Sequence, residues 1–137
     1  TIRKAMERIV EETCQHHSLN IALDTKGLLT SRFPTRLETG IFRIFQEAIN
    51  NAVKHSRAKN IWVKLFVRER NLCLTVKDDG CGFDAKTLQR KILLGGHLGL
   101  IGMKERAAQL GGRLLVTSGV EKGVTIDMAI PIPRDEG

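Results

Sequence analysis

The sequence predicts an α+β domain: a two-layer α/β sandwich with three helices covering one face of a mixed, mostly antiparallel sheet. Three observations lead to this fold class. Apolar residues recur at helical spacing in three segments and alternate in about five others, one face per strand. The length of 137 residues suits one domain. A hydrophobic content of 42% with only 4% aromatics indicates an aliphatic core.

The first half of the chain predicts a helix, a strand and a second helix. Residues 1 to about 16 have apolar positions at helical spacing, and residues 19–23 alternate as in a strand. Pro34 stands where the next helix begins, a position that suits its fixed φ. That helix is the strongest signal in the chain, with one apolar face formed by Leu37, Ile41, Ile44, Phe45, Ala48 and Ala52.

A hairpin and a long loop follow. Residues 61–67 and 72–76 alternate on either side of a polar turn, which predicts two antiparallel strands. Residues 80–99 contain five glycines and have weak periodicity. We interpret them as a long functional loop, because a compact domain rarely keeps such a stretch without a function.

The end of the chain predicts a third helix and two more strands. The helix begins near Leu100 and stops at Gly111 and Gly112, which are typical residues for a helix C-terminus. Residues 114–117 and 124–130 alternate as strands. The whole chain, residues 1–137, is therefore predicted to be a single domain without internal repeats.

Charge and cysteine content argue against several protein classes. The net charge of +7 invites a nucleic-acid partner, but the basic residues are scattered, so a solvated basic surface that tolerates anionic ligands is the simpler interpretation. Cys14, Cys73 and Cys81 lack the spacing of metal clusters or disulfide frameworks, which favours reduced thiols in the cytoplasm. No apolar run approaches the length of a membrane span, so we expect no membrane contact by this domain. The sequence begins at Thr1, directly in a helical pattern and without an initiator methionine, so we interpret it as part of a larger protein.

The polar side of the helix at 37–56 carries the first candidate site residues. They lie within about 100° of arc by helical geometry and are Arg43, Glu47, Asn50, Asn51 and Lys54. Asparagine is a mediocre helix former, so two in succession suggest a demand other than helix stability. Glu47 and Asn51 are one turn apart, and their hard oxygen atoms suit Mg2+. A plain solvated helix face is the alternative.

A second group, Asp78 to Phe83, directly follows an apolar strand. Asp and Gly at a strand end are common turn residues, which is the plain interpretation. In a functional one, the Asp78 carboxylate accepts a hydrogen bond from an exocyclic amine. Gly80 and Gly82, which lack Cβ, would let the backbone approach a flat ring closely.

A third group, Gly95 to Leu100, leads into the last helix. Glycines before a helix N-terminus present free N–H groups and the positive end of the helix dipole, which favours phosphate. The spacing matches neither the P-loop nor the dinucleotide fingerprint.

Together and in this order, the three groups resemble the GHKL ATPase superfamily, which includes gyrase, a class of heat-shock chaperones, MutL and histidine kinases. Residues 45–55 look like the N box, 78–83 like the G1 box, about 84–98 like the ATP lid and 96–106 like the G2 box. The segments QEAINNAVKH and GHLGLIGMKER are most similar to those of sensor histidine kinases of the NarX and DesK type. The resemblance covers the chain to about Pro133 and implies a Bergerat ATP-binding fold with a flexible lid.

The resemblance implies catalytic roles for three residues of the N box. Asn51 would coordinate Mg2+ between the phosphates, and Glu47, where many sensor kinases have Asn, would bind the ion or orient its water. Lys54 would contact phosphate as a point charge. His55 would flank the nucleotide, with a surface histidine at the helix end as the plain alternative.

The resemblance also implies which residues bind the nucleotide. Asp78 would bind the adenine amine, with Gly80 and Gly82 allowing close approach. The lid would close over the phosphates through Gly96, His97, Gly99 and Leu100. For His97, an exposed loop residue is the plain alternative.

The same resemblance implies the reaction and the partners. The domain would bind ATP with Mg2+, leave ADP as product and donate the γ-phosphoryl group to a histidine on the dimerisation domain of the same protein, a segment absent from this sequence. A response regulator with a helix-turn-helix output domain would be the next partner. Because His16 and His17 lack the bundle pattern of a phospho-acceptor, we expect this chain to bind nucleotide without phosphorylating itself.

One departure from the family pattern lies in the last hairpin, where a Gly-Thr pair often places the Thr near adenine. Here Val124 follows Gly123, and Thr125, shifted by one residue, would point to the other face of a strand. Three alternatives stay open: another GHKL enzyme such as an anti-sigma-factor serine kinase, a nucleic-acid-binding module, and a degenerate domain that binds nucleotide only to regulate a partner.

Overall fold

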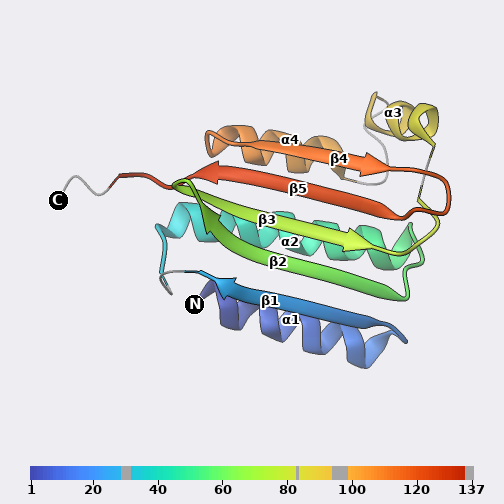
Figure 1. Cartoon of the computed structure of the whole chain (residues 1–137), viewed down its shortest axis with the longest axis horizontal. Coiled ribbons are helices and arrows are strands. Elements are labelled where there is room, and N and C mark those ends of the chain that lie inside the picture. The colour runs from blue at the N-terminus through green and yellow to red at the C-terminus, as the bar shows by residue number, and fades with distance from the viewer. Residues whose placement is uncertain (29–31, 83, 94–98, 135–137) are drawn as a thin grey trace.

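The computed structural model describes residues 1–28, 32–82, 84–93 and 99–134 and contains a five-stranded sheet. The elements in chain order are α1 (Ile2–His16), β1 (Asn20–Gly27), α2 (Thr35–Lys54), β2 (Asn60–Arg68), β3 (Asn71–Asp78), α3 (Ala85–Leu93), α4 (Leu100–Gln109), β4 (Arg113–Ser118) and β5 (Val124–Pro131). Helices α1, α2 and α4 lie along one face of the sheet, whereas α3 lies beyond its end (Figure 1). The predicted two-layer sandwich is confirmed.

The strands run in the order β1-β2-β3-β5-β4. Among the described strands, β1 and β2 alone pair in parallel, with Asn20 opposite Asn60, and α2 forms the crossover between them. The pairs β2–β3, β3–β5 and β4–β5 are antiparallel. The sheet is therefore mixed and mostly antiparallel, as the alternating apolar pattern predicted.

The core lies between the sheet and the helices. Residues on the helix side of β3 are buried along the strand, and the row ends at Asp78, which is 4% exposed. The largest fully buried side chains of the core include Met6, Ile41, Ile44, Phe45, Ile61, Leu65, Leu72, Leu74, Met103 and Ile130. Because the apolar faces of α2 and β3 pack together, the polar ends of both elements come to the same end of the sheet.

Local signals in the sequence set several element ends. The hydroxyl of Thr1 accepts a hydrogen bond from the backbone N–H of Lys4 and caps α1. Helix α4 ends at Gln109; after it, Gly111 has a φ of 80° and Gly112 donates its N–H to the carbonyl of Ala107, which completes a Schellman motif.

Helix α3 corrects the prediction that residues 80–99 form a long loop. Asp84 caps this helix, because its Oδ1 accepts the backbone N–H of Thr87 at 2.7 Å. Hydrogen bonds from Thr87 also hold the pKa of the Asp84 carboxyl below its ordinary value. Of the predicted loop and lid, residue 83 and residues 94–98 lie outside the described part of the chain.

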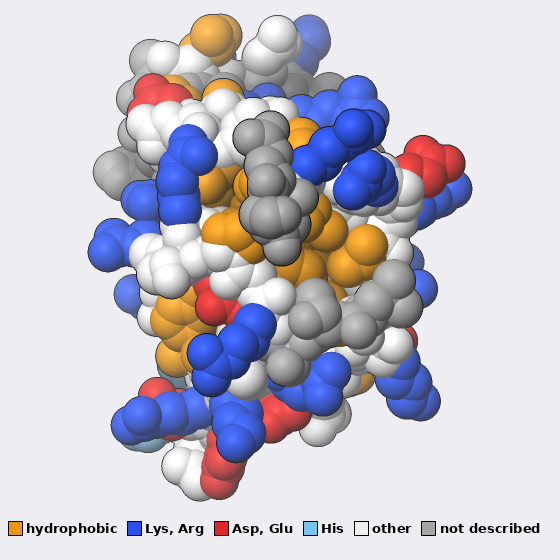
Figure 2. All heavy atoms as spheres, turned by 90° about the vertical axis from the view of Figure 1, so that its left-hand side faces the viewer, with side chains coloured by type: hydrophobic (Ala, Val, Ile, Leu, Met, Phe, Trp, Pro, Cys, Tyr) orange, Lys and Arg blue, Asp and Glu red, His pale blue; other side chains and the backbone are white. Residues whose placement is uncertain are grey.

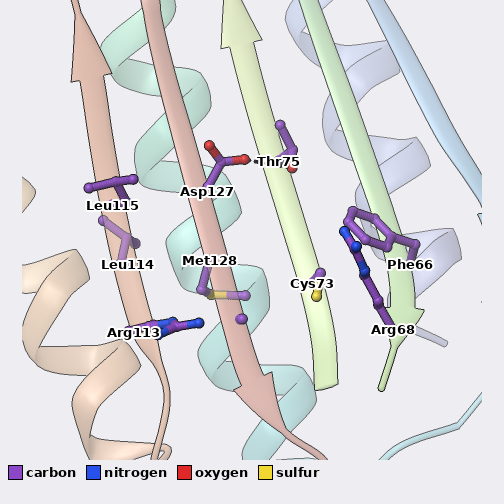
Figure 3. Close-up of a pocket in the computed structure, with 10 residues that line it drawn as sticks. Phe66, Arg68, Cys73, Thr75, Arg113, Leu114, Leu115, Asp127 and Met128 are labelled. Atoms are coloured by element: carbon purple, nitrogen blue, oxygen red, sulfur yellow. Dashed lines mark hydrogen bonds between the residues drawn. The ribbon is translucent and has the colours of Figure 1, made fainter. Parts of the chain in front are cut away.

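The outer face of the sheet carries no helix among the described elements (Figure 1). A shallow hollow of about 510 Å³ lies on it, between Arg68 and Arg113 (Figure 3). Within this face, the hydroxyl of Thr75 donates to Oδ1 of Asp127 at 2.9 Å. This hydrogen bond lies on the opposite side of β3 from the core, so it offers a comparison for polar contacts on the inner side.

On the face that Figure 2 shows, the basic residues are spread out. Figure 2 views the end where α1 begins and β5 ends, and its Lys and Arg side chains stand around a central group of hydrophobic ones rather than along one stripe. This distribution agrees with the scattered charge of the sequence. Among the helices of the described ranges, none is both long and apolar enough to cross a bilayer.

Candidate functional site

Three buried polar side chains gather at one end of the sheet. Among the described residues, Asn51, Ser56 and Asp78 are the only buried polar or charged side chains, with exposed fractions of 8%, 1% and 4%. Asn51 lies in the last turn of α2, Ser56 follows that helix, and Asp78 ends β3. Burying polar groups costs free energy unless they are hydrogen-bonded, so such a cluster marks a candidate site.

The two carboxylate oxygens of Asp78 differ in their hydrogen bonds. Its Oδ1 accepts three hydrogen bonds: from Ser56 Oγ at 2.6 Å, from the N–H of Gly80 at 2.8 Å and from the N–H of Val124 at 3.2 Å. Among the described residues, none donates to Oδ2. The three donors fix the orientation of the carboxylate, and Oδ2 is left to accept a donor from a ligand.

Ser56 links α2 to the turn after β3. Its carbonyl accepts the N–H of Cys81 at 2.9 Å, while its own N–H donates to the carbonyl of Asn51 at 3.0 Å. Sequence reasoning missed this residue, because a serine after a helix is an ordinary helix-end residue and its aspartate partner is 22 positions away. No periodicity or spacing in the sequence signals that contact.

The glycines around Asp78 correct one predicted reason for their presence. A Cβ on Gly80 would lie 2.7 Å from the carbonyl carbon of Ser56, and one on Gly82 would lie 2.7 Å from the carbonyl oxygen of Gly123. Both positions are therefore closed by the protein itself rather than left open for a flat ring. The contact of Gly80 and Gly82 with nucleotide stays a prediction.

Gly123 was not among the predicted site residues, although its environment is equally close. A Cβ there would lie 2.8 Å from the carbonyl carbon of Asp78, and its φ is 71°. Its neighbour Val124 donates to Asp78, whereas Thr125 pairs with Lys77 on the outer side of the sheet. The face change that the sequence predicted for Thr125 is confirmed.

A second part of the site lies where α2 meets the start of α4. A Cβ on Gly99 would lie 2.7 Å from the carboxyl carbon of Glu47, so this carboxylate lies against the helix N-terminus that Gly99 and Leu100 form. Gly99 has a φ of 64°, a conformation that favours glycine. Glu47 is thus held where a carboxylate interacts favourably with the helix dipole.

The remaining residues of the N box lie on different sides of α2. Asn51 is buried beside the core, not on an open polar face as the sequence suggested. Lys54 and Asn50 are exposed and line a hollow of about 230 Å³ that faces α1, together with His16. Contact of Lys54 with phosphate stays a prediction.

His55 closes α2, is half-buried, and has its carbonyl 3.9 Å from the thiol of Cys81. This position at the turn after β3 is compatible with its predicted place beside the nucleotide, which stays a prediction. Gly96 and His97 lie outside the described residues, and so does Phe83 of the G1 box.

Asp79 is a structural neighbour of the site and has a different role from Asp78. Its Oδ1 accepts the backbone N–H groups of Lys59 and Asn60, and its Oδ2 accepts the side-chain amide of Asn60 at 2.7 Å. These hydrogen bonds, the one from the Asn60 side chain first, lower the pKa of the Asp79 carboxyl. The bonds anchor the end of β3 to the start of β2.

Comparison with known proteins decides the family. A model of histidine kinase-, DNA gyrase B- and HSP90-like ATPases matches residues 36–134. The chain belongs to this family. The match includes both Asp78 and Glu47, because nearly all of α2, together with β3 and α4, lies within it.

Two proteins that the chain is similar to are sensor kinases. The chain is 38% identical over 137 residues to the signal transduction histidine-protein kinase/phosphatase DegS of Brevibacillus brevis, covering 99% of this chain and 33% of that protein. It is 32% identical to sensor histidine kinase ComP of Bacillus subtilis (strain 168), covering 94% of this chain and 16% of that protein. The chain thus spans a third or less of these relatives. It is an ATPase-family domain of the sensor histidine kinase type, as its motifs predicted.

Solved structures show the same fold. The ATP-binding domain of PrrB from Mycobacterium tuberculosis superposes with a TM-score of 0.71 at 20% identity, over 96% of this chain and 93% of that one. The blue-light activated histidine kinase of Erythrobacter litoralis gives 0.74 at 22% identity, over 93% of this chain and 40% of that one. The sandwich of helices on a five-stranded sheet is therefore that of the ATPase family.

The residues present fit the nucleotide that this family binds. Oδ2 of Asp78 lacks a donor among the described residues, and an exocyclic amine is a donor. The carboxylate of Glu47 lies at the N-terminus of α4, where phosphate and a divalent cation would share its surroundings. The end of the sheet at Asp78 thus holds one carboxylate oxygen that accepts no hydrogen bond from the described residues, and Glu47 lies against the start of α4.

Proposed function

We propose that this domain binds ATP with Mg2+ and donates the γ-phosphoryl group to a histidine on a separate dimerisation domain, leaving ADP. The observation that carries the proposal is the fixed carboxylate of Asp78, whose Oδ2 is left for a ligand donor at the same end of the sheet as Glu47 and the start of α4. Family membership supports ATP as the ligand with that donor.

Each residue has a defined part in this proposal. Asp78 binds the adenine amine, while Asn51 and Glu47 hold Mg2+ directly or through its water, and Lys54 neutralises phosphate charge. When bound, Mg2+ supplies charge neutralisation on the phosphates. Catalysis consists of positioning the γ-phosphoryl group and screening its charge. The bond from the γ-phosphorus to its bridging oxygen breaks, ADP leaves with that oxygen, and the new bond forms to a ring nitrogen of the acceptor histidine on the dimerisation domain.

The proposal includes the protein context. The dimerisation domain and a response regulator with a helix-turn-helix output domain are the partners, by analogy with the sensor kinases that the chain matches over part of their length. The domain functions in the cytoplasm, and neither a membrane nor a nucleic acid is a partner.

The test is calorimetric titration with Mg-ATP and Mg-ADP of the wild type, Asp78→Asn and the control Asp127→Asn. Because the oxygen at the Oδ1 position must keep accepting three donors, the amide introduced by Asp78→Asn would point its NH2 group at the adenine amine, donor against donor. We expect the affinity to fall by about tenfold or more, since a hydrogen bond to a charged group contributes about 1.5–3 kcal/mol.

Asp127→Asn changes the same residue type on the outer face and should leave binding unchanged. If the folded wild type binds neither nucleotide, the proposal is wrong. Incubation with labelled ATP should leave the isolated chain unlabelled, and appreciable labelling would refute the assignment of the acceptor to another domain.

A further inference from the structure

Among the described residues, the hydroxyl of Ser56 has one hydrogen-bond partner, in a closed environment. Ser56 is 1% exposed, and its Oγ donates to Oδ1 of Asp78 at 2.6 Å, a short hydrogen bond of the kind that charged acceptors form. The other two donors to this oxygen are backbone N–H groups, so Ser56 provides the only side-chain donor to it among the described residues. A substitution can remove this donor and leave the other two in place.

The backbone and the hydroxyl of Ser56 are all held by neighbouring residues. Its N–H and its carbonyl are bonded to Asn51 and Cys81, and Gly80 packs against both its hydroxyl and its carbonyl. The hydroxyl therefore points at Asp78 from a fixed backbone. A donor held in this way limits rotation of the carboxylate about χ2, an angle that otherwise has a broad distribution in aspartate.

We propose that Ser56 is a positioning residue that determines specificity for the nucleobase. By holding Oδ1, it directs Oδ2 of Asp78 toward the exocyclic amine of adenine without touching the nucleotide. This inference rests on the proposed function, because it assumes that Asp78 binds a purine amine. It makes a prediction that a purely structural role does not make: the contribution of Ser56 should disappear when the ligand lacks the amine.

The experiment is a cycle of two proteins and two ligands. ATP and purine riboside 5′-triphosphate, which lacks the amine, are titrated with Mg2+ into the wild type and Ser56→Ala. We expect the Kd for ATP to rise about tenfold in the variant, which corresponds to about 1.4 kcal/mol. The Kd for the purine analogue should change by less than about twofold, within the scatter of independent effects.

The control is Thr75→Val, which removes a hydroxyl-to-aspartate hydrogen bond on the outer side of the same strand. It should change neither Kd. Should Ser56→Ala lose its folded state in circular dichroism, Ser56→Cys fills the buried volume with a weak donor and should give the same ligand-specific loss.

The outcomes separate the two levels of the proposal. Equal weakening for both ligands would show that Ser56 acts only on the structure, and no weakening for either would show that Asp78 needs no such support. Either result overturns the inference while ATP binding by the wild type still stands. A folded wild type that binds no ATP overturns the proposed function, and the role of Ser56 falls with it.

Discussion

Replacing Gly80 with alanine should destabilise the domain more than a surface change of one methyl group would suggest. The new Cβ would lie 2.7 Å from the carbonyl carbon of Ser56 and closer still to its Oγ and carbonyl oxygen. Ordinary contact between heavy atoms begins near about 3.5 Å, so the backbone must move by about 1 Å or more. Gly80 is not among the described glycines with positive φ, so the cost comes from crowding rather than from backbone conformation.

The size of the effect follows from what the movement breaks. Overpacking of a closed site costs about 1–3 kcal/mol. Weakening the two hydrogen bonds that Ser56 and Gly80 donate to Asp78 adds about 1.5–3 kcal/mol, because the acceptor is charged and buried. We therefore expect a loss of about 2.5–6 kcal/mol, a large part of the roughly 5–15 kcal/mol that typically stabilises a domain.

Guanidinium unfolding followed by circular dichroism measures the change, with Gly102→Ala as the matched control. Gly102 lies within α4, and a Cβ there would meet nothing within 4 Å. Alanine should stabilise that helix by about 0.5–1 kcal/mol. A loss below about 1 kcal/mol for Gly80→Ala would refute the crowding that we infer around Ser56, since ordinary surface changes stay within about 0.5 kcal/mol.

Two further predictions concern titration and thiol reactivity. Hydrogen bonds lower the pKa of Asp79 below its ordinary value, so its carboxylate stabilises the fold above that ordinary value and ceases to do so as the pH falls through the lower, folded-state pKa. The difference in urea midpoint between the wild type and Asp79→Asn should therefore shrink between about pH 7 and about pH 2, and an equal difference at both would contradict the assignment. Burial raises the pKa of the Cys73 thiol, whereas Cys81 is exposed beside the site, so iodoacetamide should alkylate Cys81 first. Peptide mass spectrometry gives the order of alkylation. Mg-ADP should slow the reaction at Cys81 but not at Cys14. Faster alkylation of Cys73 than of Cys81 would contradict the prediction.

The helix and strand pattern was predictable because it depends on neighbours in sequence. The apolar face of α2 repeats over 20 residues, and Gly111 with Gly112 marks the end of α4 directly. Helix α3 was missed because it spans nine residues in a glycine-rich stretch. Asp84, three positions before Thr87, was the capping signal that could have revealed it.

The site was predictable only where motif residues themselves carry the chemistry. The motifs pointed to Asp78 and Glu47, and the structure places Asp78 at the end of β3 and Glu47 against the start of α4, while their contacts with nucleotide stay a prediction. The contacts that hold them come from elsewhere: Ser56 and Gly123 reach Asp78 across gaps of 22 and 45 positions, and Gly99 reaches Glu47 from the start of another helix. Tertiary packing decides such contacts, and no local pattern encodes them.

The position of β1 at the edge of the sheet has a consequence for how the domain assembles. Strands β2 and β3 meet through the two-residue turn of Glu69 and Arg70, whereas β1 pairs with β2 over a separation of 40 residues, at Asn20 and Asn60. Closing the longer loop costs more chain entropy, so we expect the hairpin to form before β1 joins the sheet. In native-state hydrogen exchange, the amides of β1 should therefore open at lower free energy than those of β3, which is paired on both sides.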